Sequence, residues 1–258
     1  MPAASPITAE QLKIVFPSAD PADLKTIAAD LNLNPVAFGL DSNPRRAHFF
    51  AQVRQESGPD LSDLTENLNY GADALLKFGY YKAHPAEAAV DGHSADRDPV
   101  TKRYRRAANV QVIANKAYGG RAELGNGDIA SGDGWRFRGR GCIQVTGRAN
   151  YAAISQQCKS LYPGMDVDFV AHPDTMAEFP GAIRSAVGFW VLHGLHKLAD
   201  KGVTGADVGV GAAPPPYTAL TGSVTFRKAI ALVRITALSR VMTSCSCTSR
   251  MMSLVTSL

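Results

Sequence analysis

The stretch GWRFRGRGCIQVTGRANY, which runs from Gly134 to Tyr151, carries the densest motif of this 258-residue chain. It closes a glycine-rich region over residues 119–141 whose Gly-Asn-Gly and Gly-Asp-Gly triplets are typical of turns, and a helix is expected over residues 149–162. Gly139-Arg140-Gly141 is not a dinucleotide fingerprint, because no strand precedes it and the third glycine is misplaced. The alternating arginines have two possible roles: they bind phosphate, or they pair with acidic groups and line a groove. We favour the second interpretation.

Helical patterns flank this stretch on both sides. Thr8-Ala9-Glu10-Gln11 is a capping box that starts a first helix, and Asp20-Pro21 starts a second with proline at its first helical position. A third helix is expected from about Pro44 to Ser57, where Gly58-Pro59 ends it. The remaining predictions are an extended segment over 65–70, helices over 72–78, 105–118 and 180–200, and a surface loop over 85–99.

The composition is that of a globular protein, with 45% hydrophobic and 19% charged residues. No window of 18 apolar residues indicates a membrane-spanning helix, and the first residues show no secretion signal. Four cysteines are too few for a disulfide scaffold, so Cys142 and Cys158 are expected to be reduced core residues. These features favour synthesis in the cytoplasm.

The net charge of +4 is unevenly distributed. All 23 acidic residues lie at or before Asp207, and the first 208 residues carry 22 basic groups, a net charge of −1. The chain body therefore has no basic field, and we expect no nucleic-acid partner. We divide the chain into an N-terminal helical segment (1–42) packed on a main domain (43–202) and an atypical tail (203–258), which is disordered or translated out of frame.

Two glutamates stand out as candidates for acid–base chemistry. Phe49, Val53 and Glu56 share one helical face, so Glu56 lies on the apolar side of the last turn. Burial and the negative end of the helix dipole are expected to raise the pKa of Glu56, as a general acid needs. Glu66 lies in a polar extended stretch that keeps a carboxylate ionised. Two carboxyl groups in unlike surroundings are typical of glycosidases.

Three motifs in order resemble glycoside hydrolase family 19. The segment GRGCIQVTGRANY (139–151) resembles the family signature, and AHFFAQVRQESG (47–58) resembles its helix that carries the general acid, with Gln55 in place of the usual histidine. The segment ENLNY (66–70) resembles the phage endolysin branch more than the plant chitinases. The match covers roughly Pro44 to Leu198.

The resemblance implies a fold and roles for particular residues. The implied fold is mainly α, a lysozyme-like domain of two lobes with a substrate groove and a small extended element. Glu56 would be the general acid, Glu66 the base, and Thr146 the hydroxyl that holds the attacking water with the base. The residues implied to bind substrate are Gln144, Asn150 and Tyr70, with Arg184 in the ionic network of the catalytic site.

The implied activity is inverting hydrolysis of β-1,4 bonds of peptidoglycan, which is muramidase-like and bacteriolytic. Alternatives are a chitinase of the same mechanism and a non-catalytic glycan-binding or truncated relative. Neither a cofactor nor a metal is expected, and His193 and His196 lack further ligands spaced for zinc. The expected partner is the polysaccharide, bound by a monomer without membrane insertion. As a phage endolysin, the protein would be made in the host bacterial cytoplasm and reach the periplasm and cell wall through a holin.

Overall fold

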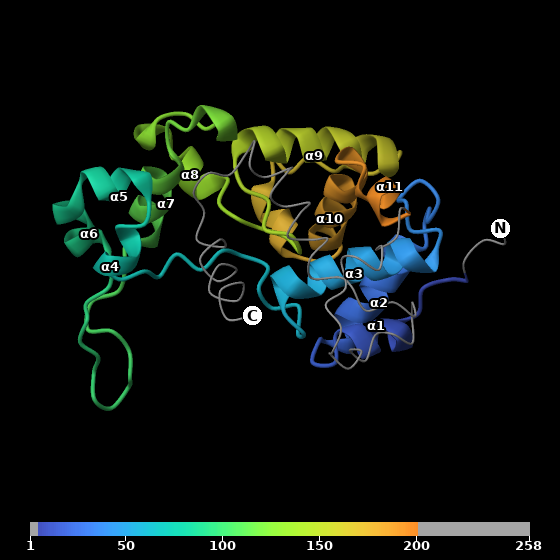
Figure 1. Ribbon diagram of the computed structural model, residues 1–258, viewed down its shortest axis with the longest axis horizontal. Helices are drawn as coiled ribbons and strands as arrows, with labels where there is room; N and C mark the ends of the chain where they lie inside the picture. Colours follow the sequence, from blue (N-terminus) through green and yellow to red (C-terminus); the bar gives the residue numbers. More distant parts are fainter. Residues whose placement is uncertain (1–4, 201–258) are drawn as a thin grey trace, which may run out of the picture. The chain divides into compact units, whose positions relative to one another are not determined.

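The computed structural model describes residues 5–200, and these residues form helices joined by loops (Figure 1). Extended segments pair only through isolated bridges within this range, such as the antiparallel bridge between Thr65 and Arg140. The mainly α fold class is therefore confirmed. The chain divides into two compact units, and the second is an insertion into the first. The predicted tail at 203–258 lies outside the described residues.

The first unit contains residues 5–66, 139–146 and 150–200 of the described chain. Its helices pack around aromatic side chains, and the ring of Phe49 contacts the rings of Phe50 and Trp190 edge-on at 5.4 and 5.7 Å between centroids. Such edge-to-face pairs add to the free energy gained by burial. The helices are α1 (Ala9–Val15), α2 (Pro21–Leu31), α3 (Asn43–Ser57), α9 (Arg148–Leu161, in this unit from residue 150), η3 (Pro173–Ala177), α10 (Gly181–Leu192) and α11 (Leu195–Ala199).

The starts of α1 and α2 follow from local sequence. The Thr8 hydroxyl accepts a hydrogen bond from the backbone N–H of Gln11, whose side chain accepts one from the N–H of Thr8, which confirms the capping box. Asp20 caps α2 by accepting from the N–H of Ala22, and Pro21 occupies the first helical position. Each cap satisfies N–H groups that have no partner inside the helix.

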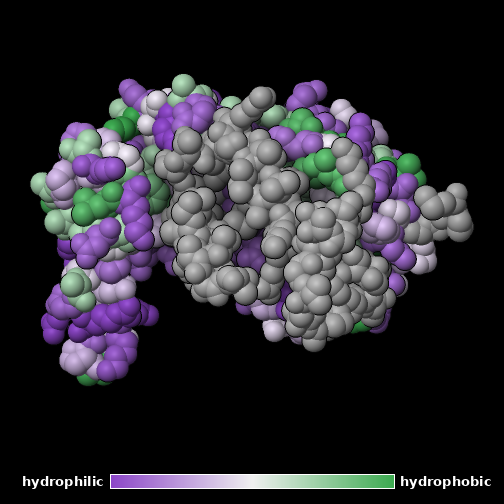
Figure 2. Space-filling model, viewed as in Figure 1, coloured by the Kyte–Doolittle hydropathy of each residue, from purple (hydrophilic) through white to green (hydrophobic). Residues whose placement is uncertain are grey.

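The second unit contains residues 67–138 and 147–149. It has its own core, and the buried side chains of that core are Leu68, Leu75, Phe78, Tyr81, Ala88, Ile113, Ala114, Ala117, Tyr118 and Leu124. Its helices are α4 (Ala72–Leu75), α5 (Gly79–Ala83), α6 (Pro85–Asp91), α7 (Val110–Tyr118), η1 (Ala122–Leu124), η2 (Ile129–Ser131) and α8 (Asp133–Arg136). A loop over residues 94–106 extends from α6, and Figure 2 shows mostly hydrophilic side chains along it.

Three predicted elements differ from the structure. The surface loop expected over 85–99 begins as α6, because Pro85 suits the first position of a helix that the polar composition obscured. The helix expected from residue 105 begins only at Val110, where the Asn109 side chain accepts from the N–H of Val112. The helix expected over 180–200 is broken at Gly194, whose φ of 62° ends α10 before α11 starts.

Residues 5–42 of the proposed N-terminal segment fall inside the first unit, whereas residues 43–200 of the proposed main domain include residues of both units. Phe16 at the end of α1 packs on Phe50 of α3, with ring centroids 6.3 Å apart. The division into an N-terminal segment, a main domain and a tail stays a prediction. Among residues 5–200, no helix has the length and hydropathy needed to cross a membrane.

Candidate active site

Glu56 stands half-buried in the last turn of α3. Phe49 and Val53, which share its helical face, are 2% and 1% exposed, so this face lies on the core as expected. The Gln52 amide, one turn earlier, donates a hydrogen bond to Glu56 Oε1 at 2.9 Å. Gly58 ends the helix with a φ of 78°. The carboxylate is therefore held beside an amide donor at the edge of an apolar core.

Glu66 lies on an extended segment that pairs with the glycine-rich loop. Its backbone N–H donates to the carbonyl of Gly139 at 2.8 Å, and the N–H of Gly141 donates to the carbonyl of Leu64 at 2.9 Å. The N–H of Gly139 also donates to Glu66 Oε2 at 3.3 Å. The side chain of Glu66 is thus fixed against the backbone of the signature segment, 73 residues later in the chain.

The signature segment turns back on itself between Arg140 and Val145, whose backbones exchange hydrogen bonds of 3.1 and 2.8 Å. Gln144 at this turn adopts a positive φ of 55°, and its amide donates to the carbonyl of Asp63 at 2.6 Å. A left-handed backbone is uncommon for a residue other than glycine and is concentrated at functional sites. Gln144 therefore has a constrained position next to the Glu66 segment.

Thr146 and Asn150 continue this arrangement into α9. The Thr146 hydroxyl donates to the carbonyl of Gln144 at 3.2 Å, and the Asn150 amide donates to the carbonyl of Thr146 at 2.7 Å. Both side chains are half-buried. A chain of hydrogen bonds therefore connects three of the residues that the resemblance assigned to the site.

Glycine at position 139 leaves room for two of these side chains. A Cβ there would lie 3.0 Å from Gln144 Oε1 and 3.3 Å from Glu66 Oε2. These distances also show that the carboxylate of Glu66 and the amide of Gln144 approach the same backbone position. That Glu66, Gln144, Thr146 and Asn150 form one catalytic site stays a prediction.

A buried hydrogen bond connects the end of α3 to the same segment. Ser57, next to Glu56, is fully buried, and its hydroxyl donates to the carbonyl of Cys142 at 2.8 Å. Burial raises the pKa of the Cys142 thiol to about 12, so it is a neutral core group rather than a nucleophile. Both candidate carboxylates thus extend from elements bonded to residues 139–146, all within the first unit.

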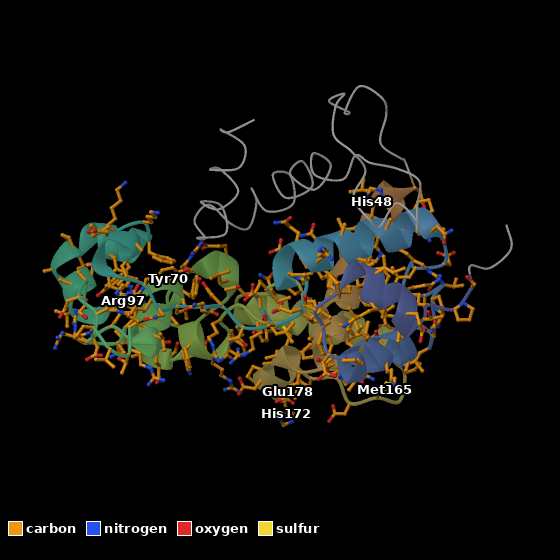
Figure 3. All side chains as sticks on the ribbon, turned by 90° about the horizontal axis from the view of Figure 1, so that it is seen from below. His48, Tyr70, Arg97, Met165, His172 and Glu178 are labelled. Carbon is orange, nitrogen blue, oxygen red and sulfur yellow. The ribbon has the colours of Figure 1, made fainter. Side chains whose placement is uncertain are left out.

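The two other predicted site residues contact different partners. Arg184 on α10 binds Asp30 of α2 through Nε and Nη2, both at 2.7 Å, and the hydroxyl of Tyr162 donates to the same carboxylate. Tyr70 belongs to the second unit (Figure 3), where its ring packs on Phe78 at 5.5 Å. Their expected roles in catalysis and substrate binding stay predictions.

Sequence reasoning gave Arg140 too little weight. Its side chain is 2% exposed, and its guanidinium donates to the hydroxyl of Tyr151 and pairs with Asp174 at 2.6 Å. Arg148 likewise pairs with an acidic group, because its Nε and Nη2 both donate to the carboxylate of Asp133. The alternation of arginine and glycine was the sequence signal for this structural role. The pairing with acidic groups that we favoured over phosphate binding is observed for Arg140 and Arg148.

Fold and site together define a class. Glu56 and Glu66 have different surroundings, and the two elements that carry them are both hydrogen-bonded to the loop that leads into α9. In a mainly helical chain, this arrangement is typical of a glycosidase of the lysozyme and chitinase type. No family model matches the chain. A glycosyl hydrolase family 19 domain-containing protein of Haemophilus influenzae is 34% identical over 185 residues, which cover 71% of this chain and 78% of the relative. The chain belongs to glycosyl hydrolase family 19 and hydrolyses O-glycosyl bonds.

Proposed function

We propose that this enzyme is an endolysin-type muramidase that cleaves the β-1,4 bonds of peptidoglycan with inversion. The proposal rests on one observation: Glu56 and Glu66 extend from two different elements that are both bonded to residues 139–146. Because α3 carries Glu56 and a separate extended segment carries Glu66, the two carboxyl groups can stand apart from each other. An inverting reaction needs about 6.5–9.5 Å between the groups, so that a water molecule fits beside the sugar.

In the proposed reaction, Glu56 donates its proton to the oxygen of the leaving sugar as the glycosidic bond breaks. A water molecule attacks the anomeric carbon from the opposite face, and Glu66 accepts a proton from this water. Thr146, half-buried and two residues from Gln144, would hold the same water. Gln144 and Asn150 would orient the sugar. Each turnover ends when the proton passes from Glu66 back to Glu56 through solvent.

Replacement of either carboxylate tests the proposal. Glu56→Gln and Glu66→Gln keep the shape of each side chain but remove its proton chemistry, so clearing of purified bacterial walls should fall by about 10²–10⁴-fold. Glu178→Gln is the matched control, because Glu178 is an exposed glutamate of the same unit (Figure 3). Its activity should equal that of the parent. Full activity in Glu56→Gln would refute the mechanism.

Mass analysis of the soluble fragments separates the possible substrates. Fragments that end in reducing N-acetylmuramic acid support the muramidase proposal, whereas another new reducing sugar shows that a different bond is cut. The same preparation is tested on chitin. Turnover of chitin alone supports the chitinase alternative, and binding of either polymer without turnover supports a non-catalytic glycan-binding protein.

A further inference from the structure

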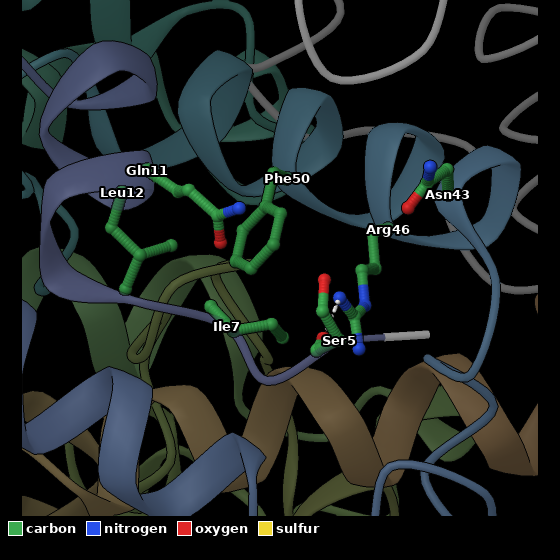
Figure 4. A pocket seen from close by; sticks show the side chains of 7 residues that line it. All are labelled: Ser5, Ile7, Gln11, Leu12, Asn43, Arg46 and Phe50. Carbon is green, nitrogen blue, oxygen red and sulfur yellow. Dashed lines mark hydrogen bonds between the residues drawn. The ribbon is translucent and has the colours of Figure 1, made fainter. Parts of the chain in front are cut away.

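A small cavity lies in the first unit between the N-terminal segment and the start of α3 (Figure 4). Its volume is about 140 Å³. The residues that line it are Ser5, Ile7, Gln11, Leu12, Asn43, Arg46 and Phe50. Arg46 precedes Glu56 by ten residues, which corresponds to about 15 Å along a helix. The cavity is therefore separate from the candidate active site.

Arg46 is the unusual member of this lining. Its side chain is buried, with 8% of the residue exposed. Nε donates to the carbonyl of Leu40 at 2.7 Å and Nη1 to the carbonyl of Ser5 at 2.6 Å. Nη2 is buried and has no hydrogen-bond partner among the described residues. Two neutral carbonyls thus position the guanidinium, and one of its nitrogens is left to bind something else.

The Asp41 carboxylate, whose charge acts on Arg46, does not supply that partner. Asp41 pairs with Arg45 at 2.7 Å, and Arg45 also binds Asp200. Burial lowers the pKa of Arg46, but an arginine remains protonated in proteins. An unsatisfied donor on a buried charge costs more free energy than on a neutral group. An anion in the cavity would remove this cost, because it supplies both an acceptor and a negative charge.

The rest of the lining indicates what kind of anion fits. Gln11 and Asn43 contribute amide groups, whereas Ile7, Leu12 and Phe50 contribute apolar surface. In Figure 4 the side chains of Ile7 and Phe50 are seen between the Gln11 amide and the Arg46 guanidinium. A cavity of about 150 Å³ accommodates a guest the size of benzene. We propose that this cavity binds a small carboxylate with a short aliphatic group, whose carboxyl oxygens contact Arg46.

The test is a titration of the full chain with sodium propionate, monitored by amide chemical shifts and by thermal unfolding. Sodium chloride keeps the ionic strength constant throughout the titration. We expect saturable shifts at the residues that line the cavity and a rise in Tm, because the ligand binds only the folded state. Propionate is compared with N-acetyl-D-alanine, which presents the same chemistry as the end of a peptide. Binding of either supports the site and identifies the source, a free acid or a peptide terminus.

Two variants and one control decide the result. Arg46→Lys has a single nitrogen, which cannot bind the two carbonyls and the ligand together, so it should weaken binding at least about tenfold. Asn43→Leu replaces an amide of the lining with an apolar side chain and keeps Arg46, so it should weaken binding even if Arg46→Lys fails to fold. Arg45→Lys, on the adjacent position outside the cavity, should bind as the parent does. No saturation up to roughly 50 mM, a cavity that takes water alone, or equal binding by Asn43→Leu would overturn the proposal.

Discussion

At the scale of single residues, the site depends on side chains that fix the backbone around the two glutamates. Glu56 itself contacts Gln52 one turn away, but its neighbour Ser57 reaches across 85 residues to the carbonyl of Cys142. Ser57 is fully buried, so water cannot replace its hydroxyl at that carbonyl. The hydroxyl of Ser57 therefore helps to fix the orientation of the last turn of α3.

Ser57→Ala should lower the free energy of unfolding by about 1–3 kcal/mol, because the buried carbonyl of Cys142 loses its donor. Urea denaturation measures this loss, and wall clearing at a temperature where the variant is folded should also fall as Glu56 loses its fixed position. Ser160→Ala is the control, since Ser160 is exposed on α9 and alanine favours the helix. Equal stability of both variants would contradict the role given to Ser57.

At the scale of elements, the turn formed by residues 139–146 packs closely on α10. Gly141 has a φ of 79°, and a Cβ there would lie 2.4 Å from the hydroxyl of Ser185. Ser185 is fully buried and its hydroxyl donates to the carbonyl of Ala182, so it cannot move aside without losing that bond. Both the backbone conformation and the lack of space therefore require glycine at this position.

Gly141→Ala should be clearly more destabilising than Gly164→Ala. Gly164 has a similar φ of 81° but open space around its Cβ position, so alanine there pays only the left-handed penalty of about 1–2 kcal/mol. At Gly141 a steric cost of about 1–3 kcal/mol adds to that penalty. Urea denaturation of both variants isolates the packing contribution. If the two variants are equally stable, the turn does not pack on α10 as described.

At the scale of the whole molecule, distant segments of the chain build the first unit. Asp30 on α2 binds Arg184 on α10, 154 residues later, and Phe16 after α1 packs on Phe50 of α3. Asp30 is 5% exposed, so its ion pair is largely screened from water. The N-terminal segment is therefore part of the core that supports Glu56, through the helix that carries both Phe50 and the glutamate.

Phe16→Ala should reduce the free energy of unfolding by about 3–5 kcal/mol, because the side chain is 1% exposed and its loss leaves a cavity against α3. Ile14→Ala is the matched control on α1, where the side chain is 45% exposed, and it should cost less than about 1 kcal/mol. Chemical denaturation monitored by far-UV circular dichroism gives both values. A small effect of Phe16→Ala would mean that the segment adds little to the core.

Prediction from the sequence was most successful where a few neighbouring residues decide the structure. The capping box at Thr8, proline at the start of α2 and the end of α3 at Gly58 are each determined within one or two helical turns. The apolar face shared by Phe49, Val53 and Glu56 follows from helical spacing alone. The family motif then associated Glu66 and Gln144 with Glu56, although no local pattern connects these residues.

Only the tertiary structure decided how residues far apart in the chain pair. Glu66 bonds with Gly139, and Ser57 bonds with Cys142. Arg184 of α10 bonds with Asp30 of α2 rather than with a residue of its own helix. Helix signals in a sequence arise from groups three or four residues apart, whereas these partners are separated by loops of arbitrary length and leave no periodic trace. Local chemistry therefore determined the helices and their ends, and packing determined which side chains meet at the site.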